Sequence, residues 1–355
     1  MGPDLSHVTA FTEHVGSGQS RPRSFYALDP PGEHYYLFRP TRAAFETVAG
    51  MIAGEGLKRR LGGYALRGCA VAPVFARLVP FVSTRTLDVG DGFDCDIAVL
   101  SNRTRLVDLG EQVVYTIPSG GPERVVDEVY ARERLPPTIT VPTLHDYDLD
   151  YPYLAEAFVT GTHPRSPVEG WPFLLDALDQ LTDLYRNDPE PVAVSGILDD
   201  AKTTLDERGL LAEPPFDRAF DLLMRLHLPE YLYRAWVHRD LHTRNVLVED
   251  ERVCILDWES AGQDLVVRDL FRPFTIAYYD TRDPRPFVEL CTCEGTGGEI
   301  VDDYIDVVGE YAMAGPGRYS GLPVLYLLST LADKERTEFW ESKRELLSEV
   351  IDRIQ

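Results

Sequence analysis

Lysine and positive charge are scarce in this chain. Of the 35 basic residues among 355, only four are lysines, and the formal net charge is -23. This balance argues against nucleic acid or an anionic membrane as the main partner. An acidic, lysine-poor surface is typical of adaptation to high salt, where a large net charge keeps a protein soluble, so we expect a halophilic protein. The competing interpretation is attraction of cationic ligands, but the charge is scattered along the whole chain.

Cysteine is also scarce, and the number is odd. The five residues include no Cys-x-x-Cys pair, and Cys291 and Cys293 have no His or Cys set at zinc spacing nearby. This pattern excludes a disulfide framework and a structural zinc site. We expect reduced thiols and a cytoplasmic protein.

Long hydrophobic runs are missing. The most apolar window, Tyr64–Val82, contains Arg67, Arg77 and two prolines. It is a poor membrane span and a better buried segment. The first twenty residues have no apolar core flanked by positive charge, so we expect neither a signal peptide nor a transmembrane segment.

The distribution of strand and helix patterns predicts three regions. Residues 1–90 form an N-terminal extension with extended pieces around 23–30 and 33–40 and a helix over 41–60, which is structural or binds a protein partner. Residues 91–162 are rich in strand formers, and residues 163–355 in helical periodicity. This order predicts a two-lobed α+β fold.

A hairpin and a helix are expected in the strand-rich region. The runs "TRLVDL" and "QVVYTIP" flank Gly110-Glu111, which suits a two-residue type II′ turn with glycine first. "PERVVDEVYARERL" then carries apolar residues at helical spacing, and "PYLAEAFVTG" is typical of another strand.

The densest polar cluster is "WVHRDLHTRNVLVEDERVCILDWE", residues 236–259. Its spacing is His238-x-Asp240-x4-Asn245, followed twelve residues later by Asp257. The runs "NVLVED" and "RVCILDW" predict a hairpin around Asp250-Glu251, so the polar groups lie at the ends of rigid strands, a placement that favours catalysis.

This pattern resembles the aminoglycoside phosphotransferase and choline kinase family, whose fold is protein-kinase-like. The match rests on "HRDLHTRN" and "LDWE" and covers about residues 95–335. The resemblance implies a small antiparallel N-lobe sheet with one helix, and a larger helical C-lobe that carries the catalytic hairpin. It further implies that Asp240 orients the substrate hydroxyl, that His238 braces the loop, and that Asn245, Asp257 and more loosely Glu259 hold Mg2+.

The resemblance also implies a nucleotide site in the strand-rich region. Ser101, Asn102 and Arg103 take the place of the phosphate-covering loop, but this loop has no glycine. Glu128 matches the acidic helix residue, with Glu133 as the alternative. The strand lysine of the family is missing, because Thr116 occupies its position.

Arg105 offers a substitute for the missing lysine. If Gly110-Glu111 is a two-residue turn, Arg105 pairs with Thr116, and directly paired residues point to the same face. Arg105 would then reach the phosphates and Glu128, whereas otherwise it is an ordinary exposed arginine. Asp269 matches the family acid that braces the catalytic loop, or is simply an acid at a helix N-terminus.

Two functions therefore remain open. The first is an ATP- or GTP-dependent, Mg2+-requiring kinase that phosphorylates a hydroxyl of a small molecule, such as a sugar, amino alcohol or glycoside. The second is a nucleotide-binding pseudokinase or scaffold, which the glycine-free loop and the absent lysine favour. The acceptor and the oligomeric state are not encoded in any pattern of the sequence.

Overall fold

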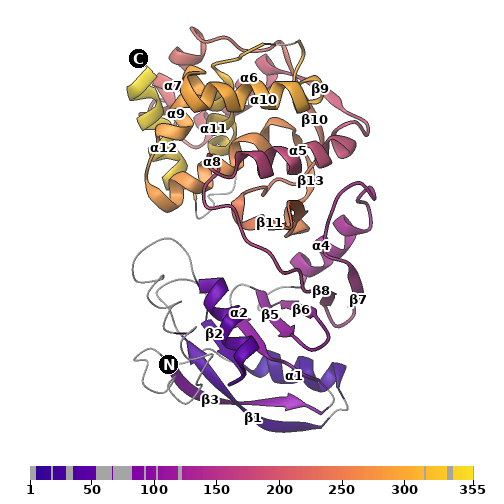
Figure 1. Cartoon of the computed structure of the whole chain (residues 1–355). Helices are drawn as coiled ribbons and strands as arrows, with labels where there is room; N and C mark the ends of the chain where they lie inside the picture. Colours follow the sequence, from indigo (N-terminus) through magenta and orange to yellow (C-terminus); the bar gives the residue numbers. More distant parts are fainter. Residues whose placement is uncertain are drawn as a thin grey trace. The chain divides into compact units, whose positions relative to one another are not determined.

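The computed structural model divides the chain into two compact units. Unit 1 comprises residues 1–130 and 142–159, and unit 2 comprises residues 131–141 and 160–355 (Figure 1). The structure describes residues 5–16, 19–28, 35–52, 66, 82–91, 93–100, 103–118, 122–315, 317–333 and 339–354. The apolar window 64–82 lies almost wholly outside these ranges. Within them, no helix combines the length and the apolar character needed to cross a membrane.

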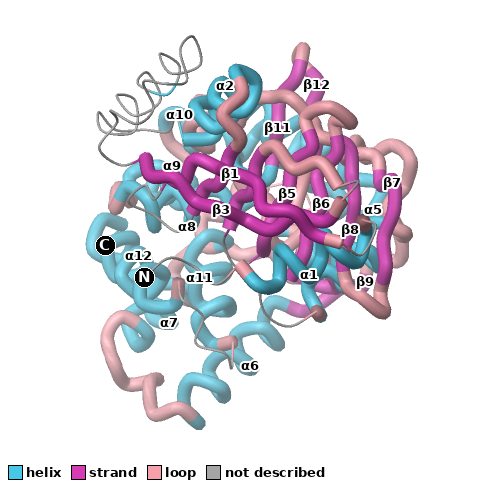
Figure 2. Tube along the Cα trace, turned by 90° about the horizontal axis from the view of Figure 1, so that it is seen from below, coloured by secondary structure: helices cyan, strands magenta, loops and turns pink. Residues whose placement is uncertain are grey.

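The described part of unit 1 holds one antiparallel sheet of eight strands in the order β3-β1-β2-β4-β5-β6-β8-β7. Figure 2 labels β1, β3, β5, β6, β7 and β8 of this sheet. The strands are β1 (Ser20–Leu28), β2 (Tyr35–Phe38), β3 (Val82–Gly90), β4 (Ile97–Leu100), β5 (Arg103–Asp108), β6 (Val113–Pro118), β7 (Leu144–Asp148) and β8 (Tyr153–Ala157). The helices are α1 (Ser6–Val15), α2 (Arg42–Ile52) and α4 (Glu123–Arg132), whose end at residues 131–132 belongs to unit 2.

The N-terminal region continues this sheet. β2 pairs with β4, so that Tyr36 lies opposite Val99, and β1 pairs with both β2 and β3. The sheet is therefore larger than the small lobe with one helix that the resemblance implied. The added strands cover the edge that β4 would otherwise expose, and exposed sheet edges favour aggregation. The structure has two compact units, and the division into three regions at residues 90 and 162 stays a prediction.

Helices cover both faces of the sheet because neighbouring strand residues point to opposite sides. Leu37 packs in one core with Val8 and Phe11 of α1, whereas Phe38 packs in the other with Phe45 of α2. Leu154 of β8 packs against α4. The face that holds Leu154 also holds its partner Thr116 and, beyond that, Arg105. α1 lies so close to β3 that a Cβ on Gly90 would meet the carbonyl oxygen of Thr12 at 2.0 Å.

The β5–β6 turn differs from the expectation, although its register agrees. Arg105 pairs with Thr116 and Val107 with Val114, as predicted. The last pair, however, is Asp108 with Val113, and the left-handed residue is Gln112, not Gly110, so the type II′ assignment is wrong. The physical reason is the Asp108 carboxylate, which accepts the backbone N–H groups of Gly110 and Glu111 and builds a longer loop.

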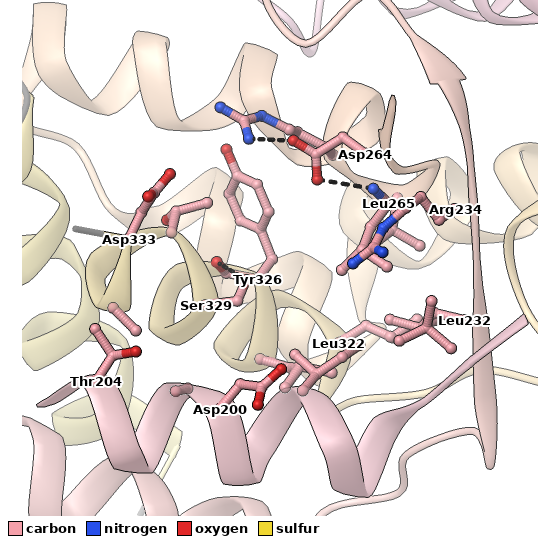
Figure 3. Close-up of a pocket in the computed structure, with 18 residues that line it drawn as sticks. Asp200, Thr204, Leu232, Arg234, Asp264, Leu265, Leu322, Tyr326, Ser329 and Asp333 are labelled. Carbon is pink, nitrogen blue, oxygen red and sulfur yellow. Dashed lines mark hydrogen bonds and ion pairs between the residues drawn. The ribbon is translucent and has the colours of Figure 1, made fainter. Parts of the chain in front are cut away.

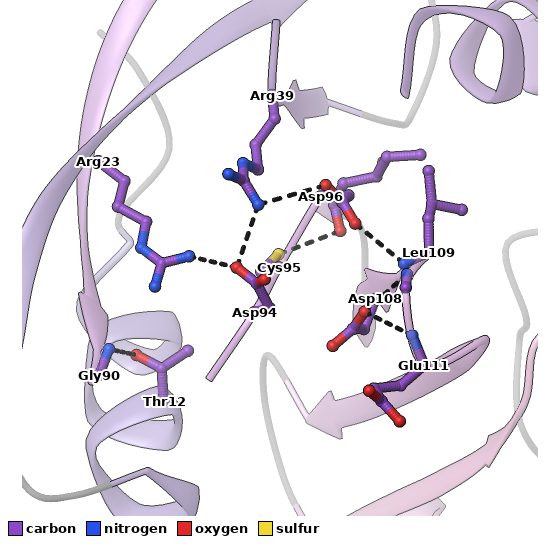
Figure 4. Close-up of polar contacts among 12 residues, drawn as sticks. Thr12, Arg23, Arg39, Gly90, Asp94, Cys95, Asp96, Asp108, Leu109 and Glu111 are labelled. Carbon is purple, nitrogen blue, oxygen red and sulfur yellow. Dashed lines mark hydrogen bonds and ion pairs between the residues drawn. The ribbon is translucent and has the colours of Figure 1, made fainter. Parts of the chain in front are cut away.

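A network of charges supports this hairpin in unit 1 (Figure 4). Asp94 accepts hydrogen bonds from Arg23 at 2.6 Å and Arg39 at 3.1 Å. Asp96 lies 3.5 Å from Arg39 and accepts the backbone N–H of Leu109 at 3.0 Å. The network joins β1, the end of β2 and the β5–β6 turn.

Unit 2 is mainly helical. Its described helices are α5 (Trp171–Tyr185), α6 (Val194–Glu207), α7 (Phe216–Leu223), α8 (Val267–Thr281), α9 (Arg285–Thr292), α10 (Gly295–Ala312), α11 (Leu322–Ala332) and α12 (Trp340–Ile354). Its strands are β9 (Glu190–Ala193), β10 (Tyr231–Val237) and β13 (Gly262–Leu265) in one sheet, and β11 (Val246–Glu249) and β12 (Arg252–Ile255) in a hairpin. The helices surround one large core, and α11, apolar on nearly every side, is buried within it.

The predicted β11–β12 hairpin is present. Glu249 pairs with Arg252, and the two residues between them, Asp250 and Glu251, both have positive φ. This is the geometry of a type I′ turn, whose twist matches the flanking strands. The hairpin holds the polar loops described next.

Candidate functional site

The polar cluster of residues 238–259 lies on two loops of unit 2. β10 ends at Val237 and is followed by His238, Asp240 and the short 3-10 turn η2 (Thr243–Asn245). The hairpin returns the chain to Asp257 and a second turn, η3 (Trp258–Ser260), in which Glu259 lies. Short strands thus fix both ends of each loop.

His238 connects the two loops. It is fully buried, its Nε2 lies 2.9 Å from the carbonyl oxygen of Leu256, and its Nδ1 accepts the N–H of Asp240 at 3.3 Å. Since Nδ1 accepts, Nε2 carries the proton and donates it to Leu256. The hydrogen bonds expected of a bracing histidine are therefore present, and the ring also packs against Trp258.

Asp240 is held by three side chains. Arg272 Nε donates to its Oδ1 at 2.8 Å, Asn245 Nδ2 lies 3.3 Å from its Oδ2, and His242 Nε2 lies 3.6 Å from the same oxygen. Burial alone would raise the pKa of Asp240, but the hydrogen bond from His242 and the charge of Arg272 outweigh it and hold this pKa well below the usual range. The carboxylate is therefore ionised at neutral pH.

A backbone hydrogen bond connects Asn245 with Leu256, the residue before Asp257. The backbone oxygen of Asn245 accepts the N–H of Leu256 at 2.9 Å, and Asp257 follows directly in a left-handed conformation with φ 59°. Arg239, in the other loop, is also left-handed with φ 66°. Such conformations are costly for residues other than glycine and concentrate at functional sites.

The two loops carry side chains with oxygen atoms that could bind a metal. Asn245 uses its Nδ2 on Asp240, so its amide oxygen points elsewhere, and Asp257 and Glu259 add carboxylates. Mg2+ prefers such oxygen ligands, usually one or two protein groups together with substrate phosphates. The donor set fits Mg2+. Nowhere in the described ranges do three His, Cys, Asp or Glu side chains gather as a metal cluster, and an ion of this kind does not need one.

Asp269 of α8 braces the loop that carries His238 and Asp240, in the way the family pattern implied. It is fully buried and accepts the backbone N–H groups of His238 at 2.9 Å and Arg239 at 2.8 Å. Tyr185 of α5 donates its hydroxyl to the same carboxylate at 3.0 Å. These bonds support the strained Arg239. Asp269 also lies in the first turn of α8, so the alternative expectation, an acid at a helix N-terminus, is met too.

The sequence analysis missed Arg272, which binds the candidate catalytic carboxylate. Arg272 Nη2 lies 2.7 Å from Asp240 Oδ1, in addition to the hydrogen bond from Nε. Its guanidinium also lies over the ring of Phe339, 5.4 Å from the centroid. One signal was available, because Arg272 follows Asp269 by three residues and so shares its helix face.

Lys343 of α12 was missed as well. Only 8 % of its surface is exposed. Burial, and next the positive charges of Arg272 and Arg268, lower the pKa of Lys343 to about 7. No sequence signal pointed to it, since its place beside α8 is set by the packing of distant helices.

The predicted nucleotide residues lie in unit 1, where the structure pairs Glu128 with Arg103. Arg103 Nη1 donates to Glu128 Oε2 at 2.7 Å, and both side chains are buried. The alternative acid, Glu133, is exposed beyond the end of α4. The expectation named Arg105 as the partner and placed Arg103 in the covering loop, whereas Arg103 is the first residue of β5.

The structure describes two of the other four residues predicted for the nucleotide site, Thr116 and Arg105. Thr116 is buried on β6 opposite Arg105, and both lie on the sheet face that α4 covers. Ser101 and Asn102 lie outside the described residues. The residues predicted for nucleotide and those predicted for catalysis and metal thus fall into different compact units.

A separate pocket of about 590 Å3 lies in unit 2 and contains none of the predicted residues (Figure 3). β9, α6, β10, β13, α8 and α11 supply its lining, which includes Asp264 and Arg268. Asp264 binds Arg268 and also lies 3.3 Å from Arg239 Nε. The wall of the pocket therefore contacts Arg239 in the loop that carries Asp240.

Comparison with known proteins gives one decisive match. The model of the "Phosphotransferase enzyme family" matches residues 97–301, more than half of the chain. The chain belongs to this family. The match begins at β4 and ends within α10, so β1, β2 and β3 lie outside it. No curated protein matches the chain.

Solved structures of the family are distant from this chain. A thermostable mutant of the aminoglycoside phosphotransferase APH(4)-Ia, solved with ADP and hygromycin B, is 14% identical over 70% of this chain and 89% of its own, with a TM-score of 0.41. A choline/ethanolamine kinase family protein from Mesorhizobium loti is 14% identical over 72% and 85%, with a TM-score of 0.43. The choline kinase LicA from Streptococcus pneumoniae is 10% identical over 71% and 90%, with a TM-score of 0.45.

Proposed function

We propose that this phosphotransferase moves the terminal phosphate of ATP or GTP to a hydroxyl of a small molecule, such as a sugar, amino alcohol or glycoside, in an Mg2+-dependent reaction. The observation that carries the proposal is the state of Asp240. It is an ionised carboxylate on a braced loop, and the amide of Asn245 contacts it. Phosphoryl transfer needs such positioning and charge stabilisation more than covalent help.

Asp240 accepts the hydrogen bond of the acceptor hydroxyl and aligns its oxygen with the phosphorus. The new bond joins that oxygen to the terminal phosphorus, the bond from phosphorus to the leaving nucleotide oxygen breaks, and the proton passes to Asp240 and then to water. His238 and Asp269 keep the loop in place. Asn245, Asp257 and Glu259 would hold Mg2+, which when bound neutralises charge on the nucleotide phosphates.

Arg103 takes the role of the missing strand lysine in this proposal. In protein kinases an ion pair between a strand lysine and a helix glutamate must be in place for activity. Here the buried pair of Arg103 with Glu128 is the corresponding contact. Ser101, Asn102, Arg105 and Thr116 complete the proposed nucleotide group, and residues 1–90 remain a candidate surface for a protein partner.

A thermal melting experiment tests the nucleotide and metal parts together. Ligand that binds the native state raises the unfolding midpoint. We expect ATP or GTP to raise it, and Mg2+ to enlarge the rise. Asp257→Asn should abolish the Mg2+ contribution, whereas the same change in the exposed β11–β12 turn, Asp250→Asn, should leave it intact. A chain whose midpoint responds to neither nucleotide, with or without Mg2+, would not be a kinase.

One observation favours the alternative, a nucleotide-binding pseudokinase. Thr116 is buried where the family resemblance places a lysine. Nucleotide binding without release of ADP, across a panel of sugars and amino alcohols, would support that alternative. Release of ADP that depends on the acceptor and is lost in Asp240→Asn would exclude it.

A further inference from the structure

Arg239 lies between the buried His238 and the candidate catalytic Asp240, and its backbone is left-handed with φ 66°. An arginine rarely adopts this conformation, because its Cβ then crowds the following carbonyl oxygen. The turn at Arg239 brings the backbone N–H of Asp240 to within 3.3 Å of His238 Nδ1. The position of Asp240 relative to His238 therefore depends on the conformation of one strained residue.

The Arg239 side chain leaves its own loop and binds β13. Its Nη2 donates to the carbonyl oxygen of Gln263 at 2.6 Å, and its Nε lies 3.3 Å from Oδ2 of Asp264. The guanidinium lies against Gly262, where an added Cβ would come within 3.1 Å of Nη1 and 3.2 Å of Cζ. The glycine at position 262 thus leaves the space that the guanidinium occupies.

The neighbouring residues His238 and Arg239 hold the two ends of the second loop. His238 Nε2 donates to the carbonyl oxygen of Leu256, and Arg239 Nη2 donates to that of Gln263. The residues between these two acceptors, 257–262, include both carboxylates of the candidate Mg2+ site. Because the two contacts come from consecutive residues of the first loop, they fix these carboxylates relative to the residue that follows Arg239, the candidate catalytic aspartate.

We propose that Arg239 is a positioning residue that holds residues 257–262 in place relative to Asp240, so that the carboxylates of this segment can bind Mg2+ beside the acceptor hydroxyl. The inference rests on the proposed function, which requires that metal. A strained conformation persists where the surrounding contacts over-determine it. Here Asp269 accepts the backbone N–H of Arg239 at 2.8 Å, and β13 accepts its side chain. Glycine would adopt the left-handed backbone without strain but could not reach β13.

Replacement of Arg239 by glycine separates the side chain from the backbone. Arg239→Gly removes the guanidinium and tolerates the left-handed conformation, so the unfolding midpoint without ligands should change little. The midpoint is then followed against Mg2+ concentration in the presence of a non-hydrolysable ATP analogue. Because loss of groups that orient metal ligands typically weakens metal binding by tenfold or more, the Mg2+ concentration for half of the rise should increase about tenfold. Arg234→Met, at an exposed arginine of β10, is the control and should leave this concentration unchanged.

Replacement of Gly262 by alanine tests the same contact from β13. The added methyl group should displace the guanidinium, so Gly262→Ala should also raise the Mg2+ concentration that is needed. In the background of Arg239→Gly the alanine has no guanidinium to displace and should add little. General damage to β13 would instead add to the effect of Arg239→Gly and would lower the midpoint without Mg2+ as well. In turnover assays, excess Mg2+ should restore ADP formation by Arg239→Gly.

The outcomes separate this inference from the proposed function. A weaker Mg2+ response in both single variants, without a further loss in the double variant, supports the positioning role. Equal Mg2+ responses of the wild type and both single variants, or additive losses in the double variant, overturn it while the kinase stands. A wild type whose midpoint responds to neither the ATP analogue nor Mg2+ overturns the proposed function, and the inference falls with it.

Discussion

Replacement of Arg103 by methionine is the sharpest test of the strand and helix pair in unit 1. Arg103 and Glu128 keep only 8 % and 3 % of their surface exposed, and their closest atoms are 2.7 Å apart. Loss of one partner leaves the other charge buried, which costs about 3–5 kcal/mol. For a unit of this size the unfolding midpoint should fall on the order of 10 °C.

The double variant separates the ion pair from general damage. Arg103→Met with Glu128→Gln removes both charges and should be more stable than Arg103→Met alone, with a coupling energy of about 2–3 kcal/mol. Arg105→Met is the matched control on the same strand face. Arg105 is half-buried, so its loss should cost less.

The assay can resolve the two units. All four tryptophans, Trp171, Trp236, Trp258 and Trp340, lie in unit 2, so tryptophan fluorescence follows that unit. Calorimetry follows both units. We expect Arg103→Met to shift a calorimetric transition that fluorescence does not report, and to weaken ATP binding. Equal losses of stability in Arg103→Met and Arg105→Met, or additive losses in the double variant, would refute the assignment of the pair.

Three further predictions concern unit 2 and the packing of α1. Lys343→Met should stabilise the protein by a few kcal/mol at pH 7, because the lysine pKa falls from 10.5 to about 7 on folding. Between pH 7 and 10.5 the unfolded chain therefore binds more protons than the folded chain. The stability of the wild type should rise with pH over this range relative to that of the variant. Equal pH dependence of the two unfolding midpoints would contradict this prediction. Asp269→Asn should cost about 1–3 kcal/mol and lower kcat, since an amide cannot accept all three hydrogen bonds, while Tyr185→Phe should cost less; melting and turnover of both variants decide. Gly90→Ala should lower the stability of unit 1 without shifting the tryptophan-reported midpoint of unit 2, since the added Cβ collides with the backbone of Thr12, and an unchanged calorimetric profile would contradict the close packing of α1.

Local spacing predicted the local structure of residues 238–259 well. The pattern from His238 to Asp257 specifies a loop, a hairpin and a second loop, and these contacts form between residues close in sequence. The β5–β6 register was also predictable. The assumed two-residue turn and the observed longer loop share the same centre, so Arg105 lies opposite Thr116 in both.

Contacts between distant elements could not be predicted in this way. The contact of Arg103 with Glu128 depends on where α4 lies across the sheet, and no strand pattern encodes that position. Arg272 comes from α8, whose packing against the loop after β10 places its guanidinium on Asp240. The extended sheet was missed because the strands of residues 1–90 were interpreted apart from β4.

Transfer of labelled phosphate tests the central claim most directly. The protein is incubated with ATP or GTP labelled at the terminal phosphate, Mg2+ and a panel of sugars and amino alcohols, and the label is followed by chromatography. We predict that the wild type moves the label to a hydroxyl compound and that Asp240→Asn, which keeps the shape of the side chain but not its charge, does not. Retention of all label in nucleotide or free phosphate by a wild type that still binds nucleotide would contradict a small-molecule kinase.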